Sequence, residues 1–176
     1  MLGYVISEGR GAADRLLAEV ATLLRAEGIA VAGAVQINHD TPDNPKCDMD
    51  LAILTSGDQV RISQRLGSLS RGCRLDPAGL EQAVGLIEGE LRRTDASPAI
   101  LIINKFGKQE LDGRGFRPAI GMALEAGIPV LTSVNRTNAA YFSDWSGGLA
   151  EQIPDTVADV MSWSRSHMPL SDARTK

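Results

Sequence analysis

The sequence predicts one α/β domain in which a mostly parallel sheet lies between two layers of helices. Three observations lead to this prediction. Apolar runs typical of strands alternate along the chain with segments that carry a helical apolar stripe. The run Ala99–Ile103 is unbroken and rich in β-branched residues, which is typical of a parallel strand covered on both faces. The opening strand is followed directly by a glycine-rich turn and a helix.

The first elements are a strand, a glycine turn, a helix and a second strand. The apolar run Leu2–Ser7 predicts the strand, and Glu8–Gly11 predicts the turn. Gly28 is suited to end the helix, and Ile29–Ile37 predicts the second strand. The helix itself is predicted by apolar residues at helical spacing, namely Leu16, Leu17, Val20, Leu23 and Leu24.

A loop and a β-hairpin follow. Two prolines and several aspartate and asparagine residues make His39–Lys46 a predicted loop. Apolar and polar residues then alternate over Asp48–Ile53 and again over Gln59–Ser63, with Gly57 and Asp58 between the two runs. This pattern predicts a hairpin with one polar face.

The remaining elements alternate between helix and strand. Gly67–Arg74 is a predicted loop, and Asp76 followed by Pro77 is typical of a helix start. The apolar stripe of that helix consists of Leu80, Val84, Ile87 and Leu91. After the strand at Ala99–Ile103, the predicted segments are a polar loop over Gly107–Gly115, a helix from Phe116 to Gly127, a strand over Ile128–Val134 and a helix over Thr156–His167.

Length and composition fit one globular domain. The chain has 176 residues, with a hydrophobic fraction of 43% and a charged fraction of 23%. We expect a single domain over residues 1–168 and a flexible tail over residues 169–176. A net charge of −4 argues against a nucleic-acid binder that relies on bulk positive charge. No apolar run approaches the roughly 20 residues of a membrane span, and the start lacks the basic segment of a secretory signal, so we expect a cytoplasmic protein.

A glycine loop between a first strand and a first helix is suited to bind an anion. The free amide hydrogens at the start of the helix point towards the loop, and the helix dipole favours negative charge there. The phosphate-loop pattern G-x-x-x-x-G-K-[ST] overlays Ser7–Asp14. In that pattern the lysine reaches the terminal phosphates and the hydroxyl holds magnesium. Here Ala13 takes the place of the lysine and Asp14 takes the place of the hydroxyl.

Three interpretations of this loop stay open: a tight turn without a ligand, an anion site, and magnesium-dependent hydrolysis. Because the lysine and the hydroxyl are both missing, a magnesium requirement is doubtful, and the expected ligand is a nucleotide or a tetrahedral oxyanion. The predicted anion-binding residues in the loop are Ser7, Glu8, Gly9, Arg10, Gly11, Ala12 and Ala13.

Asn104 and Lys105 follow the continuous apolar run. Phosphate-loop enzymes place there an acid that supports magnesium, often with a second acid that activates water. An amide cannot act as a general base, whereas a cation at the carboxyl end of a strand suits an anion site. Asn104, Lys105, Lys108 and Arg10 are therefore predicted to complete the site; the alternative is that the two lysines are simply solvated. For an enzyme, Lys105 and Glu110 are the candidate catalytic residues.

Two further groups of residues have more than one interpretation. Cys47, Cys73 and Asp48 are candidate metal ligands; the alternatives are inert thiols and a redox pair. Asn135, Arg136 and Asn138 follow the strand at Ile128–Val134, where they either line the same site or cap the next helix.

Four motifs carry a resemblance to known families. They are Ser-Glu-Gly-Arg-Gly at Ser7–Gly11, Cys-Asp-Met-Asp-Leu at Cys47–Leu51, Arg-Gly-Cys-Arg-Leu-Asp at Arg71–Asp76 and Asn-Lys-Phe-Gly-Lys-Gln-Glu at Asn104–Glu110. On these motifs the chain resembles a bacterial domain family of unknown function whose members are often labelled as molybdenum-transport-associated. More distantly, it resembles the cancer-related, thermophile-type nucleoside-triphosphatases, whose corresponding strand ends in Asp-Glu-Ile-Gly-x-x-Glu-Leu. The resemblance implies a three-layer α/β/α phosphate-loop fold with a β-hairpin insertion. It does not imply hydrolysis, because the hydrolytic residues differ.

Three hypotheses for the function follow. The first is a degenerate phosphate-loop protein that binds an anion or nucleotide phosphate without efficient hydrolysis, linked by the resemblance to molybdate or a related oxyanion. The second is a divergent nucleoside-triphosphatase in which Lys105 substitutes for the loop lysine and Asp14 or Glu110 for the magnesium ligand. The third is an accessory or regulatory protein that uses Cys47 and Cys73 for metal or redox sensing. The expected partners are a small anionic ligand and either a second copy of the chain or a transport-related protein.

Overall fold

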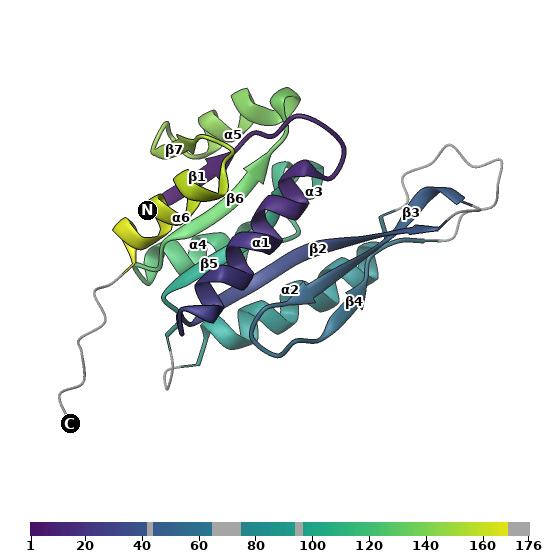
Figure 1. Ribbon diagram of the computed structural model, residues 1–176, viewed down its shortest axis with the longest axis horizontal. Coiled ribbons are helices and arrows are strands. Elements are labelled where there is room, and N and C mark those ends of the chain that lie inside the picture. The colour runs from purple at the N-terminus through teal and green to yellow at the C-terminus, as the bar shows by residue number, and fades with distance from the viewer. Residues whose placement is uncertain (42–43, 65–74, 94–96, 169–176) are drawn as a thin grey trace.

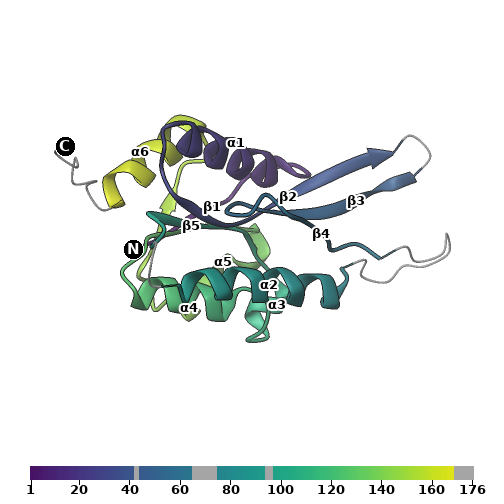
Figure 2. The ribbon, with the colours of Figure 1, turned by 90° about the horizontal axis from the view of Figure 1, so that it is seen from below.

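The described part of the chain folds into one sheet with helices on both faces (Figure 1, Figure 2). This computed structural model describes residues 1–41, 44–64, 75–93 and 97–168, and of residues 40, 41 and 44–47 it describes the backbone only. Seven strands follow one another across the sheet in the order β4-β3-β2-β5-β6-β1-β7 within those residues. Their bounds are β1 (Leu2–Val5), β2 (Val31–Thr41), β3 (Asn44–Ile53), β4 (Gln59–Arg61), β5 (Ile100–Phe106), β6 (Val130–Val134) and β7 (Ala150–Ile153).

The sheet is mostly parallel, as predicted. Strands β2, β5, β6, β1 and β7 pair with one another in parallel, and β3 and β4 are added at one edge as an antiparallel hairpin. Parallel pairing brings the carboxyl ends of β1, β5 and β6 to one edge of the sheet. Val5, for example, lies beside Ser133, and Ile103 lies beside Thr132. The loops that follow these strands therefore emerge close together.

The helices form two layers, which Figure 2 shows above and below the sheet. One layer consists of α1 (Ala12–Ala26) and α6 (Val157–His167). The other consists of α2 (Pro77–Leu91) and α4 (Arg117–Glu125), with the short helices α3 (Lys108–Leu111) and α5 (Ala139–Trp145) and the 3₁₀ turn η1 (Arg136–Asn138). The N-cap prediction for α2 is confirmed, because Asp76 accepts a hydrogen bond of 3.1 Å from the Ala78 N–H.

Two hydrophobic cores separate the layers. Ile100 and Ile102 of β5 belong to the core under α1 and α6, whereas Leu101 and Ile103 belong to the core under α2 and α4. All four side chains are fully buried. The prediction that this run is a strand covered on both faces is therefore confirmed, and β5 is fixed in the middle of the fold.

The predicted loop at His39–Lys46 is wrong for most of its length. Strands β2 and β3 continue past the sheet as a two-stranded ribbon, in which His39 pairs with Asp48 and Thr41 pairs with Asn44 (Figure 1). Strand β4 pairs with β3 at residues 50–52, and beyond these no described strand pairs with β3 on the side away from β2, where Pro45 lies. A proline lacks an N–H donor and is tolerated at such an edge. The predicted loop at Gly67–Arg74 and the predicted tail at residues 169–176 lie outside the described residues.

Three short elements do not follow from the sequence pattern. The predicted polar loop at Gly107–Gly115 contains α3, and the segment before the last helix contains α5 and β7. Helix α5 has seven residues and is held by tertiary contacts of its rings: Phe142 is fully buried and packs edge-on against Phe106 at a centroid distance of 4.8 Å. Periodicity cannot reveal an element this short, because a stripe needs several turns.

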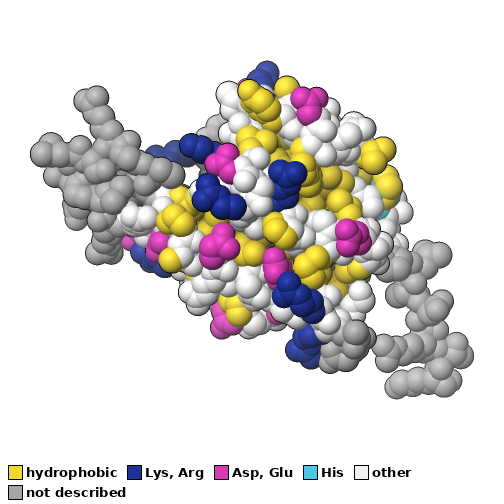
Figure 3. Space-filling model, turned by 180° about the vertical axis from the view of Figure 1, so that it is seen from behind, with side chains coloured by type: hydrophobic (Ala, Val, Ile, Leu, Met, Phe, Trp, Pro, Cys, Tyr) yellow, Lys and Arg dark blue, Asp and Glu magenta, His cyan; other side chains and the backbone are white. Residues whose placement is uncertain are grey.

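The surface on the side away from the view of Figure 1 is mixed in character. Figure 3 shows basic, acidic and hydrophobic side chains interspersed on this side of the described residues, rather than gathered by sign. Among the helices of the described residues, none is both long enough and apolar enough to cross a membrane.

Candidate functional site

The glycine loop leaves the carboxyl end of β1 and leads into α1. Gly9 and Gly11 have φ angles of 95° and 69°, in the left-handed region that favours glycine, and Gly11 is the N-cap residue of α1. Helix α1 has 15 residues, and the first N–H groups of a helix have no partner within it. The structure thus places the predicted residues from Ser7 to Ala13 around the positive end of a helix dipole.

The first turn of α1 is joined to two strands through Asp14. Its Oδ1 accepts a hydrogen bond of 2.8 Å from the side-chain amide of Asn104, at the end of β5. Its Oδ2 accepts one of 2.8 Å from the side-chain amide of Asn38 and a longer one of 3.4 Å from that of Gln36, both on β2. Amide N–H groups from three side chains therefore surround one carboxylate.

Compared with the phosphate-loop pattern, the acidic residue and the uncharged polar residue have changed places between the helix and the strand. In the pattern, a hydroxyl stands on the helix and a carboxylate stands on the strand. Here the carboxylate, Asp14, is on the helix and the amide, Asn104, is on the strand. The two were identified separately from sequence, and the structure places them in direct contact. Nothing in the sequence indicated that Gln36 and Asn38 complete the group.

Two buried acceptor atoms lack a partner in this part of the described structure. The Oδ1 atom of Asn104 and the Oγ atom of Ser7 are inaccessible to solvent and have no hydrogen bond. Asn104 as a whole is 2% exposed. Leaving a buried polar atom unpaired costs about 1–3 kcal/mol, so such atoms often mark places where a further group binds. Asn104 lies near the carboxyl end of β5, and Ser7 lies just beyond the carboxyl end of β1, so both atoms are at this edge of the sheet.

Two arginines from different elements contact the glycine loop. Arg15 of α1 folds back, and its Nη1 donates a hydrogen bond of 3.3 Å to the carbonyl oxygen of Arg10. Arg136 of η1 extends from beyond β6, and its Nη2 lies 2.6 Å from Oε1 of Glu8. Asn135 caps η1 by accepting the Asn138 N–H, whereas the side chain of Arg136 turns to the loop, so the two residues differ in what they do. Sequence reasoning missed Arg15, for which helical spacing from the loop was the available signal.

The lysines predicted at this site are exposed. Lys105 follows the buried Asn104 on β5, and Lys108 begins α3. Lys105 makes no hydrogen bond or ion pair within the described part of the chain. Its ammonium group is thus available to an anion at the strand end, and its place in the site stays a prediction.

Glu110 is buried and holds a loop together. Its two carboxylate oxygens accept hydrogen bonds of 2.8 Å from the Gly107 N–H and 3.0 Å from the Phe116 N–H. Burial raises the pKa of Glu110, and the backbone hydrogen bonds partly oppose that rise. Because both carboxylate oxygens accept backbone hydrogen bonds, Glu110 stabilises the loop between Gly107 and Phe116. Its catalytic role stays a prediction.

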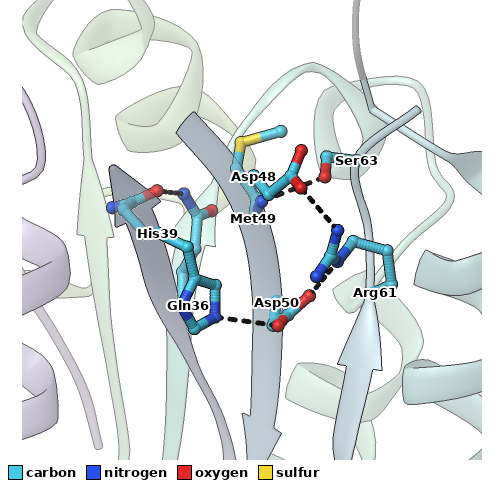
Figure 4. Close-up of polar contacts among 8 residues, drawn as sticks. Gln36, His39, Asp48, Met49, Asp50, Arg61 and Ser63 are labelled. Atoms are coloured by element: carbon cyan, nitrogen blue, oxygen red, sulfur yellow. Dashed lines mark hydrogen bonds and ion pairs between the residues drawn. The ribbon is translucent and has the colours of Figure 1, made fainter. Parts of the chain in front are cut away.

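The predicted polar face of the hairpin carries an ion-pair cluster in which the two carboxylates are buried and their partners are exposed (Figure 4). Asp48 and Asp50 are 8% and 7% exposed, and both accept hydrogen bonds from Arg61 of β4. His39 of β2 binds Asp50 from the other side, with its Nε2 2.8 Å from Oδ2. Hydrogen bonding to Asp50 raises the pKa of Arg61.

The metal candidates are only partly described. Asp48 is paired with Arg61, while the side chain of Cys47 and all of Cys73 lie outside the described residues. Within the described residues, no group of three or more His, Cys, Asp and Glu side chains is placed to hold a metal ion. The metal and redox interpretations of the cysteines therefore stay predictions.

A cavity of about 620 Å³ lies at the opposite edge of the sheet. Arg25 at the end of α1, Val31 at the start of β2 and Glu90 near the end of α2 contribute to its wall. The cavity lies at the amino ends of the parallel strands β2 and β5, so it is separate from the glycine loop, which follows the carboxyl end of β1. None of the residues predicted to bind an anion lines it.

Comparison with known proteins assigns the family. Residues 2–163 match the family described as "Protein of unknown function (DUF2478)". The chain belongs to the DUF2478 family. The DUF2478 chain is also 33% identical over 152 residues to the molybdenum import ATP-binding protein ModC 2 of Bradyrhizobium diazoefficiens. That match covers 86% of this chain and 17% of the relative, so the chain spans only a small part of the length of that protein.

Two solved structures share the fold of the DUF2478 chain. A human cancer-related nucleoside triphosphatase has a TM-score of 0.67 at 19% identity, covering 96% of this chain and 98% of that one. THEP1 from the hyperthermophile Aquifex aeolicus has a TM-score of 0.60 at 14% identity, covering 92% and 97%. The predicted three-layer phosphate-loop NTPase-like fold is thereby confirmed, and so are both resemblances noted from the sequence motifs.

Proposed function

We propose that this chain binds a small tetrahedral oxyanion, or the phosphate group of a nucleotide, at its glycine loop without efficient hydrolysis. The observation that carries the proposal is the contact between Asp14 and Asn104. The carboxylate stands where a hydroxyl would hold magnesium, and the amide stands where an acid would support it. The start of α1 and the nearby arginines Arg10, Arg15 and Arg136 supply the positive potential that an anion needs.

The fold family implies a magnesium ion beside the nucleotide, and the residues present fit it poorly. Ala13 offers no charge to the terminal phosphates. Both oxygens of Asp14 already accept amide N–H groups, and these donors take up lone pairs that a metal ion would need. We therefore assign no step to a metal ion in this chain.

A tetrahedral oxyanion fits the donor set better than a nucleotide triphosphate. Molybdate, sulfate and phosphate need N–H and guanidinium donors and no accompanying metal. The Bradyrhizobium relative is a molybdenum import ATP-binding protein, and this likeness supports an oxyanion of the molybdate type.

The same relative supports a partner and a place of action. It contains a segment similar to this chain within a protein about six times as long as the matched part, since the match covers 17% of it. We propose that this chain acts in the cytoplasm as a separate partner of a transport-related protein, whereas in the Bradyrhizobium relative the similar segment is part of the same polypeptide.

Isothermal titration calorimetry tests the proposal. We expect the full chain to bind molybdate, sulfate or phosphate equally well with and without magnesium. We also expect phosphate release from ATP to stay at the level of a magnesium-only blank. Silence towards all three oxyanions and ATP at millimolar concentration would overturn the proposal. Phosphate release that Lys105→Ala abolishes would replace it with the divergent nucleoside-triphosphatase.

A further inference from the structure

An ion pair bridges the mouth of the glycine loop. Glu8 lies in the loop after β1, and Arg136 begins the 3₁₀ turn after β6. The two residues are 128 positions apart in sequence, but β1 and β6 are parallel neighbours, so both segments leave the same edge of the sheet. Nη2 of Arg136 lies 2.6 Å from Oε1 of Glu8.

The ion pair between Glu8 and Arg136 is exposed to solvent and therefore easily broken. The side chain of Arg136 is 77% exposed and that of Glu8 is 81% exposed, so water and dissolved ions compete for both charges. The ion pair of Arg61 with Asp48 is different, because the side chain of Asp48 is only 11% exposed. The next residue, Gly9, carries no side chain, and a Cβ added there would meet nothing within 4 Å. The backbone of Arg136 is meanwhile held by the Asn135 cap of η1.

We infer that Glu8 acts as an internal substitute for the ligand and that Arg136 is an anion-binding residue of the loop. In the free protein the Glu8 carboxylate forms an ion pair with the guanidinium of Arg136. An arriving oxyanion takes over the guanidinium, whose planar donors match a tetrahedral anion in two parallel hydrogen bonds, and Glu8 turns to solvent. This inference rests on the proposed function, because it concerns the same site.

The exchange gives the site a positive side chain that the loop itself lacks. Ala13 stands where a phosphate-loop lysine would reach the ligand, and the guanidinium of Arg136 enters the loop region from the neighbouring strand end instead. It also sets a threshold, since a ligand must outcompete a tethered carboxylate. Anions with two negative charges meet that condition better than those with one.

Calorimetry with inorganic phosphate and with molybdate tests the exchange on four forms of the full chain. These are the wild type, Glu8→Gln, Arg136→Gln and the double variant. We expect Glu8→Gln to bind the two anions about 3- to 10-fold more tightly and Arg136→Gln to bind about 10-fold more weakly. In the double variant the gain from Glu8→Gln should largely disappear, because there is no guanidinium left to release. Both side chains are exposed, so folding is not at risk.

Glu27→Gln is the matched control. Glu27 also forms an ion pair with an arginine, Arg165, but it lies at the other end of α1. Glu27→Gln removes one negative charge, as Glu8→Gln does, and we expect this substitution to leave anion affinity unchanged. If Glu8→Gln gives the same gain with and without Arg136, the effect is long-range charge and the exchange is overturned while the proposed function stands. If none of the four forms binds either anion, the exchange is overturned, and titration with sulfate and ATP then decides whether the proposed function fails with it.

Discussion

The carboxylate of Asp14 and the side-chain amide of Asn104 are joined by a hydrogen bond of 2.8 Å between the first turn of α1 and the end of β5. This contact links the two segments that carry nucleotide chemistry in phosphate-loop proteins. It holds an acid and an amide in exchanged positions.

We expect Asn104→Asp to lower the free energy of unfolding by about 2–3 kcal/mol, because it puts two carboxylates within contact in a buried place. Asp14→Asn combined with Asn104→Asp restores one acid and one amide and should recover most of that loss. Urea unfolding of the three variants measures both values. A double variant as unstable as Asn104→Asp alone would show that the pair is not complementary.

Glu110 gives stability a specific dependence on pH. Its pKa in the folded chain is raised above the ordinary value of 4.5, so its favourable contribution is complete below that value and declines as the pH rises through the folded pKa. The destabilisation caused by Glu110→Gln should therefore become smaller as the pH rises from about 4 to 7. Unfolding measurements at several pH values test this trend. Glu125→Gln, at an exposed glutamate of α4, controls for the loss of one carboxyl group.

Gly33 is needed where β2 passes β5. Its φ angle is 111°, and an added Cβ would lie 1.9 Å from the carbonyl oxygen of Ile102. We expect Gly33→Ala to cost at least about 3 kcal/mol of unfolding free energy, from strain and from displacement of β5. Gly85→Ala is the contrast, because that helical glycine of α2 has open space around it. It should stabilise the chain by about 0.5–1 kcal/mol. Thermal unfolding of both variants measures the two changes, and a similar loss of stability in Gly85→Ala would show that the close contact at Gly33 is not the cause.

Restoring the loop lysine should restore affinity for nucleotides but not hydrolysis. We expect Ala13→Lys to tighten ATP binding by about 10-fold, since the ammonium group can reach the terminal phosphates. Phosphate release should stay at the blank level because Asn104 still stands in the place of the acid. Ala26→Lys, at the exposed far end of α1, adds the same charge away from the loop and should have no effect. Hydrolysis by Ala13→Lys alone would contradict the role given to Asn104.

Elements that depend on neighbouring residues were predicted correctly. The helix start at Asp76, the buried strand before Asn104 and the glycine loop each have their cause within a few residues, as a cap, an apolar run or a need for positive φ. The ribbon past His39 and the helix α5 escaped prediction because partners distant in sequence stabilise them: β3 pairs with β2, and Phe106 packs on Phe142.

The sequence by itself determined the fold class, the order of most elements and the absence of the usual lysine, hydroxyl and acid from their phosphate-loop positions. Only the tertiary structure decided that Asp14 meets Asn104 across 90 residues and that Glu8 meets Arg136 across 128. The physical reason is the parallel sheet. It gathers the carboxyl ends of strands that are distant in sequence, and no local pattern records which side chains then face one another.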